Sequence, residues 1–216
     1  MLFCHVTSLV ATDKHQELLE RKGGQGFPHI VFLDSSGNVL AVHEDERDAE
    51  AFAKTGEKAK GFLALRARAE KGDKAAQVEY ALAQVELGQI KVAEGKERLK
   101  GRRLTKEQQA KLDGLASTAE VRKILENVTQ VQETQFAAAR KFVEMKKAGK
   151  PAPLDDDNFQ TYWILMMNLA EKEKNTALFE ECLAGLKVRF GEDPEAADFF
   201  RSKAAILKKL KEEGGR

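Results

Sequence analysis

The stretch GGQGFPHIVFLDSSGNVLAVHE, residues 23–44, carries the clearest β-sheet pattern in the chain. Two β-favouring runs, HIVFLD at residues 29–34 and VLAVH at residues 39–43, flank the short sequence SSGN. Asp34 can bond to the turn backbone and Gly37 can adopt a positive φ, so this order predicts a β-hairpin. The first run lacks polar alternation, and we expect it to be covered on both faces.

The rest of the first third of the chain extends this pattern on both sides. LFCHVT at residues 2–7 is a further β-favouring run, and residues 13–22 have the pattern of a short helix with its leucines facing inward. Residues 45–70 show apolar residues at helical spacing and predict one or two helices. Together these segments predict a β-α-β-β-α domain over residues 1–70.

Residues 71–216 contain helical patterns only and predict an all-α domain. Gly72 and Asp73 open a first helix that stops at Gly88, and a second runs from residue 90 to about residue 100. Since almost no loop separates the two, they should pack as an antiparallel hairpin. The expected fold class is therefore α/β followed by all-α helical hairpins.

Two capping-box patterns follow, Thr105 with Gln108 and Ser117 with Glu120. Each places a side-chain acceptor on the free N–H groups of a helix start and a reciprocal side chain three residues later. They predict two separate helices. The second would be long, and we expect a kink around residues 127–134.

The C-terminal segments are read as capped helices around an apolar core. The acidic residues 155–157 stand where a helix dipole favours negative charge, which indicates a helix start rather than a metal site. Residues 176–190 predict a helix, and Asp193 with the following proline starts the last one. The Trp, Met and Phe residues of 159–167 could line a ligand pocket, but such a stripe is typical of a helix-bundle core.

The charge balance excludes several classes of partner. Lys and Arg number 36 and Asp and Glu number 35, giving a net charge of +1. Because the charges are interspersed, we expect neither nucleic acid nor an anionic membrane as a partner. No apolar window is long enough for a membrane span, and the first residues lack the pattern of a signal peptide, so we expect a cytoplasmic protein.

The cysteines and histidines form no familiar chemical motif. Cys4 and Cys182 lie far apart, without a Cys-x-x-Cys pair; a long-range disulfide is possible, but two free packed thiols, with Cys182 in the core, are favoured. The histidines match no zinc spacing, and we expect solvated or locally hydrogen-bonded rings. They are His5, His15, His29 and His43. We therefore predict no catalytic residue, cofactor or metal site.

The segment GFPHIVFLDSSGNVLA resembles the C-terminal half of the thioredoxin fold, in which a cis-proline precedes a buried strand, a hairpin turn and a second strand. Pro28 matches the position of that proline. The resemblance covers residues 2 to about 70 and implies a peptide-binding loop formed by Gly26, Phe27, Pro28 and His29. In the family this loop faces a Cys-x-x-Cys pair, which this chain lacks.

The resemblance also has a structural consequence. The strand and the cysteine-bearing helix that lie at the centre of the family's fold have no counterpart before Met1. Either the strands pair differently, or helices cover the open edge, or another chain supplies the strand, or the chain is a fragment. The unpaired backbone groups of an open strand edge can pair with another chain, so we expect the sheet edge to favour a homo-oligomer.

The segment YALAQVELGQIKVAEG resembles a tetratricopeptide-type helical hairpin. Ala81, Gly88 and Ala93 match the small residues that let paired helices approach closely, whereas the later positions Glu97 and Lys100 depart from the pattern by being polar. The resemblance implies a stack of helix pairs with a concave protein-binding surface.

These observations favour a non-catalytic thioredoxin-like protein whose loop and helical region bind a protein or peptide partner. The alternative is a thiol-disulfide oxidoreductase of the thioredoxin family whose Cys-x-x-Cys segment lies upstream of this chain. A hydrolase or metalloenzyme that uses the histidines has the least support, since no serine elbow, phosphate loop or working pair of carboxylates is present.

Overall fold

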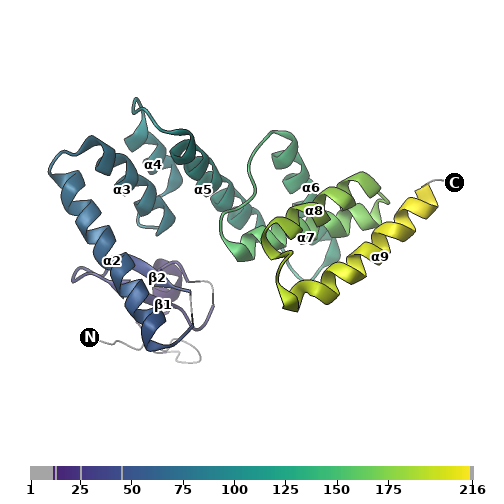
Figure 1. Ribbon diagram of the computed structural model, residues 1–216, viewed down its shortest axis with the longest axis horizontal. Coiled ribbons are helices and arrows are strands. Elements are labelled where there is room, and N and C mark those ends of the chain that lie inside the picture. The colour runs from purple at the N-terminus through teal and green to yellow at the C-terminus, as the bar shows by residue number, and fades with distance from the viewer. Residues whose placement is uncertain (1–11, 13, 25, 45, 215–216) are drawn as a thin grey trace. The chain divides into compact units, whose positions relative to one another are not determined.

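The computed structural model contains two compact units, residues 1–109 and residues 110–216, each described by itself below (Figure 1). The residues that the structure describes are 12, 14–24, 26–44 and 46–214. We predicted a domain boundary after residue 70. The first unit instead takes in the helical hairpin that follows, because that hairpin packs on the helix after the sheet.

The predicted β-hairpin is confirmed. Strands β1 (Ile30–Leu33) and β2 (Val39–His43) pair antiparallel, with Ile30 opposite His43. The backbone N–H of Asp34 donates to the carbonyl of Asn38 at 3.0 Å, and Gly37 has a φ of +80°. The turn chemistry read from the sequence therefore closes the hairpin.

The two strands differ in burial from what the sequence predicts. β1 is half-buried, and its Leu33 side chain is 44% exposed, so the expectation that this run is covered on both faces is wrong for the described chain. β2 carries the buried residues instead, including Leu40 and Ala41. Of the two strands, β2 is the one against which helix α2 (Ala49–Glu70) chiefly packs, which explains why β2 is the better covered.

The sheet of the described residues is flanked by a short helix before it and a long one after it. Helix α1 (Leu18–Arg21) is shorter than the predicted helix, and its leucines are half-buried. The predicted strand at residues 2–7 lies outside the described residues. Helix α2 (Ala49–Glu70) is a single uninterrupted helix, and Asp48 caps it by accepting from the N–H of Ala51 at 2.8 Å.

The helical hairpin of the first unit consists of α3 (Lys74–Glu86) and α4 (Val92–Leu99). Asp73 caps α3, as the sequence predicts, and the two helices pack on each other. The close approach between them is made by Gly95. A Cβ there would lie 2.3 Å from the Cγ2 atom of Val85, whereas the side chain of Ala93, the predicted contact residue, is exposed.

Helix α5 (Lys106–Leu125) confirms one predicted capping box and contradicts the other. Thr105 and Gln108 exchange both capping bonds, at 3.0 and 3.2 Å. Ser117 lies inside α5 and starts no new helix. Its buried hydroxyl donates to the carbonyl of Pro151, 34 positions along the chain. This long-range hydrogen bond replaces the helix cap that the sequence pattern predicted.

The remaining helices form the core of the second unit. Helix α6 (Gln132–Lys147) begins after a break at residues 126–131, so the predicted kink is a loop that separates two helices. Three further elements lead to α9 (Ala197–Gly214); they are α7 (Asp156–Lys172), α8 (Thr176–Phe190) and the 3-10 turn η1 (Pro194–Ala196). Asp155 caps α7 by accepting from the N–H of Asn158 at 3.0 Å, as predicted.

Helix α7 is the central helix of this core. It packs against α6 on one side and α8 on the other, and α8 packs in turn on α9 (Figure 1). Several of the core side chains are completely buried; they are Val121, Phe142, Met166, Met167, Phe179 and Cys182. The prediction that the Trp, Met and Phe stripe of residues 159–167 belongs to a helix-bundle core is confirmed.

Candidate functional site

The loop between α1 and β1 carries the residues that the sequence assigns to peptide binding. Gly26, Phe27 and Pro28 are exposed, and the peptide bond between Phe27 and Pro28 is cis. The Phe27 side chain is 59% exposed, so its ring offers apolar surface that a partner can cover. The loop therefore presents an aromatic surface to solvent.

His29 anchors the end of this loop that precedes β1, through a hydrogen bond to the backbone. Its ring is half-buried, and its Nε2 atom lies 3.0 Å from the carbonyl oxygen of Lys22. Because a carbonyl can only accept, Nε2 carries the proton in this contact. The Lys22 ammonium in turn donates to the carbonyl of Gly37 in the hairpin turn. Lys22 thus links the loop to the hairpin.

Gly24 fixes the start of the loop by close packing. It is buried, and a Cβ at this position would lie 2.3 Å from the Cδ1 atom of Leu19 and 2.8 Å from the His29 ring. Any larger residue would have to displace both side chains. The exposed aromatic ring is consequently carried on a loop that is held at both of its ends.

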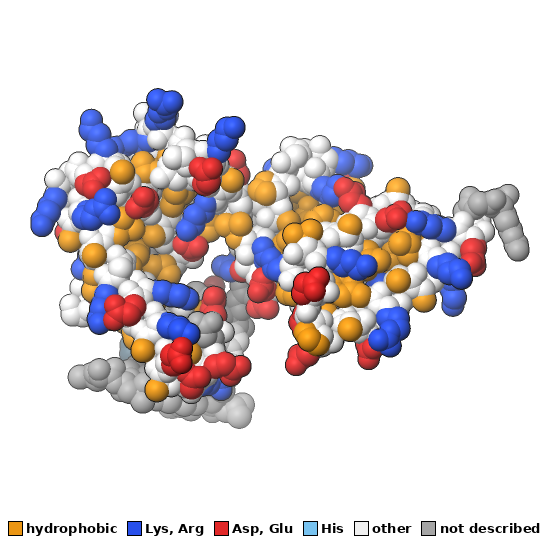
Figure 2. Space-filling model, viewed as in Figure 1, with side chains coloured by type: hydrophobic (Ala, Val, Ile, Leu, Met, Phe, Trp, Pro, Cys, Tyr) orange, Lys and Arg blue, Asp and Glu red, His pale blue; other side chains and the backbone are white. Residues whose placement is uncertain are grey.

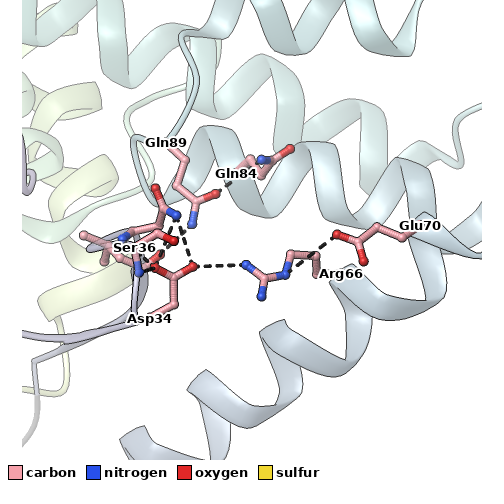
Figure 3. A network of polar contacts seen from close by, with 8 residues as sticks. Asp34, Ser36, Arg66, Glu70, Gln84 and Gln89 are labelled. Atoms are coloured by element: carbon pink, nitrogen blue, oxygen red, sulfur yellow. Dashed lines mark hydrogen bonds and ion pairs between the residues drawn. The ribbon is translucent and has the colours of Figure 1, made fainter.

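A network of polar contacts lies in the hairpin turn, which follows β1, whereas the Phe27 loop precedes it (Figure 3). One carboxylate oxygen of Asp34 accepts from the N–H groups of Ser36 and Asn38, both at 2.9 Å, and the other accepts from Arg66 of α2 at 3.1 Å. The hydrogen bond from the Asn38 side chain is the main cause that lowers the pKa of Asp34 to about 2. Asp34 is therefore a charged structural anchor and a poor general base at neutral pH.

Two glutamines connect the sheet to the helical hairpin. The Gln89 side chain donates to the carbonyl of Val39 at 2.6 Å and accepts from Gln84 of α3 at 3.3 Å (Figure 3). Arg98 of α4 extends this series of hydrogen bonds by donating to the Gln84 side chain at 2.8 Å. The sequence gives no sign of these contacts, because their partners lie up to 50 positions apart. The network holds the unit together and offers no nucleophile.

His43 is a buried histidine with both ring nitrogens occupied. Nδ1 lies 2.8 Å from the hydroxyl of Thr55, and Nε2 lies 3.1 Å from the carbonyl of Glu46. The ring stacks on Phe52 with 4.1 Å between the centroids. The prediction of locally hydrogen-bonded rings is confirmed for His29 and His43. His5 lies outside the described residues, and His15 is exposed.

Cys182 is enclosed in the core of the second unit, as predicted. Its side chain is completely buried, and that burial raises the pKa of the thiol to about 12. A thiol in this state supplies almost no thiolate for attack at neutral pH. Cys4 lies outside the described residues. Cys182 is therefore placed as a structural core residue and is a poor nucleophile in the folded chain.

The second unit also contains a groove of about 550 Å³ beside α6 and the start of α8. Its apolar floor includes Val143, Leu169 and Leu178, and charged residues form its rim. The rim charges pair with one another, for example Arg140 with Glu173 at 3.4 Å. A groove with a paired rim and no orphaned polar atom gives no sign of a specific small ligand.

Two further findings concern metals and membranes. Within the part of the chain that the structure describes, no group of three His, Cys, Asp or Glu side chains is placed to hold a metal ion. None of the described helices is long and apolar enough to span a bilayer.

Comparison with known proteins adds no relative. No family model matches the chain, and neither a curated protein nor a solved structure matches it. The thioredoxin-like and tetratricopeptide-like assignments therefore stay predictions. The Phe27 loop is the candidate site, on the strength of its geometry.

Proposed function

We propose that this chain is a non-catalytic, thioredoxin-like binding protein whose loop at Gly26, Phe27, Pro28 and His29 contacts a protein or peptide partner. The observation that carries the proposal is the 59% exposed Phe27 ring on a loop held by Gly24 and His29. Exposed aromatic residues on fixed loops are frequent hot spots of protein interfaces, because they bury a large area at a small cost in conformational entropy.

The chemistry around the loop supports binding over catalysis. The carboxylate of Asp34 is fully engaged in the turn, and His29 is held by the carbonyl of Lys22. The buried thiol of Cys182 belongs to the other unit. A loop that offers an apolar ring and backbone groups suits the main chain and one apolar side chain of a peptide. In this proposal α3 and α4 form a tetratricopeptide-like scaffold beside the sheet.

The experiment uses a displayed library of random peptides selected on the 216-residue chain. Peptides enriched on the wild type are then measured by fluorescence anisotropy against Phe27→Ser and, as a control, Val188→Ser, which changes a side chain that is 86% exposed in the second unit. We expect Phe27→Ser to weaken binding by about tenfold or more and Val188→Ser by less than about twofold. Equal effects of the two variants, or no enrichment above an unrelated control protein, would contradict the proposal.

A further inference from the structure

The connection between α4 and α5 concentrates positive charge. Residues 96–106, KERLKGRRLTK, contain six basic residues and a single acidic one, Glu97, although the whole chain has a net charge of only +1. The segment spans the end of α4, a turn in which Gly101 has a φ of +74°, and the first residue of α5. In Figure 2, Lys and Arg side chains project from the part of the first unit where α4 and the start of α5 lie in Figure 1.

Four of these six cations have no partner within the described residues. Arg98 pairs with Glu94 at 2.6 Å, and Lys100 pairs with Glu97 at 3.4 Å. The side chains of the other four are exposed and make no hydrogen bond or ion pair in the part of the chain that the structure describes; they are Lys96, Arg102, Arg103 and Lys106. In other parts of the described chain, cations such as Lys150 are held in ion pairs, here with Glu120.

We propose that residues 96–106 form a basic docking surface for an acidic segment, rich in Asp and Glu, of a protein partner. Arg102 and Arg103 are adjacent, and guanidinium groups bind carboxylates through two parallel hydrogen bonds. The N-terminal end of α5 adds a partial positive charge of the same sign at Lys106. This basic surface is separate from the Phe27 loop and does not depend on the function proposed for it.

An acidic protein segment fits this surface better than a nucleic acid does. Residues 96–106 contain no aromatic side chain on which a base could stack.

The test measures binding of a fluorescein-labelled octaglutamate peptide to the full chain by anisotropy, at about 50 mM and about 300 mM NaCl. The test variant is Arg102→Glu with Arg103→Glu and Lys106→Glu. The control variant, Lys123→Glu with Lys141→Glu and Lys208→Glu, changes the net charge equally at exposed lysines of the second unit. An oligouridylate of the same charge is the competing probe.

We expect the test variant to weaken peptide binding by about tenfold or more and the control by less than about twofold. The peptide should bind more weakly at the higher salt concentration. The proposal is overturned if the wild type does not bind the peptide, if both variants weaken binding equally, or if the oligouridylate binds more tightly than the peptide. Circular dichroism verifies folding, and a variant with glutamine at the same three positions replaces the test variant if that one unfolds. Phe27→Ser should bind octaglutamate as tightly as the wild type does. A negative result for the basic surface therefore does not contradict the function proposed for the Phe27 loop.

Discussion

In the first unit polar contacts reinforce a small apolar cluster between the hairpin and the helices, whereas the second unit is closed around a larger apolar core. Asp34, Gln84 and Gln89 connect strand, turn and helices in the first unit, and β1 remains half-buried. In the second unit Phe142 and Phe179 are completely buried. Apolar burial is non-directional, while hydrogen bonds fix positions. The two units therefore differ in how much of their packing is apolar and how much depends on directional hydrogen bonds.

The largest expected effect tests the apolar core. Phe142→Ala removes a completely buried ring that lies 5.1 Å from the ring of Tyr162, and it should lower the free energy of unfolding by about 3–5 kcal/mol. Val188→Ala changes an exposed side chain and should alter that free energy by less than about 0.5 kcal/mol. Urea unfolding followed by circular dichroism measures both. A loss below about 1 kcal/mol for Phe142→Ala would break the contrast between the units.

A smaller effect is expected where α3 and α4 approach each other. Gly95→Ala places a Cβ 2.3 Å from the Cγ2 atom of Val85, whose branched side chain is stiff, and should destabilise the chain by about 1–2 kcal/mol. Gly61→Ala in α2 meets no atom within 4 Å and should stabilise it by about 0.5–1 kcal/mol. Thermal unfolding of the two variants checks the opposite signs. A Gly95→Ala variant that is as stable as the wild type would show that α3 and α4 can move apart at little cost, and a destabilised Gly61→Ala variant would contradict the expected gain in α2.

The pH dependence of stability tests the polar contacts of the first unit, through the Asp34 carboxylate. The pKa of Asp34 is lowered from 3.8 to about 2 in the folded chain, so its carboxylate stabilises the fold above about pH 4, and this contribution is lost as the pH falls toward 2. Asp34→Ala should therefore cost about 1–2 kcal/mol at pH 7 and clearly less at pH 2, where about half of the carboxylate is protonated in the folded chain.

Urea unfolding at several pH values measures this difference. Glu192→Ala, at an exposed position, is the control, and its cost should stay small at every pH. A cost for Asp34→Ala that is the same at pH 7 and pH 2 would mean that the charge of the carboxylate does not matter.

The smallest expected effect is on redox activity. Because Cys182 is buried and its pKa is raised to about 12, the 216-residue chain should not accelerate the reduction of insulin by dithiothreitol, and Cys182→Ser should behave like the wild type. Turnover that disappears in Cys182→Ser would contradict the view that this thiol is structural. Turnover that disappears in Cys4→Ser would instead contradict the prediction that Cys4 is a packed structural thiol.

The sequence predicts well where the cause is local. The hairpin follows from turn residues within the turn itself, and the caps of Asp73, Thr105 and Asp155 follow from side chains that bond to N–H groups two or three residues away. The apolar stripe that buries Cys182 follows from helical spacing. In each case both partners stand within a few residues of each other, so their pattern is visible in the chain.

The sequence fails where the cause lies far along the chain. Ser117 resembles a cap until the carbonyl of Pro151 accepts its hydroxyl, and Ala93 resembles a contact residue although Gly95 meets Val85. The bond from Gln89 to Val39 could not be predicted for the same reason. Likewise, only the structure shows which cations of residues 96–106 are held in ion pairs.

By itself, then, the sequence determined the hairpin, the helix starts, the burial of Cys182 and the absence of a Cys-x-x-Cys pair, because these depend on spacing and on local hydrogen bonds. The tertiary structure alone decided that β1 is half-buried, that Asp34 is an anchor, and that Phe27 is exposed on a loop held at both ends. Burial and long-range polar contacts depend on which distant residues the fold brings together, and a linear pattern does not contain that information.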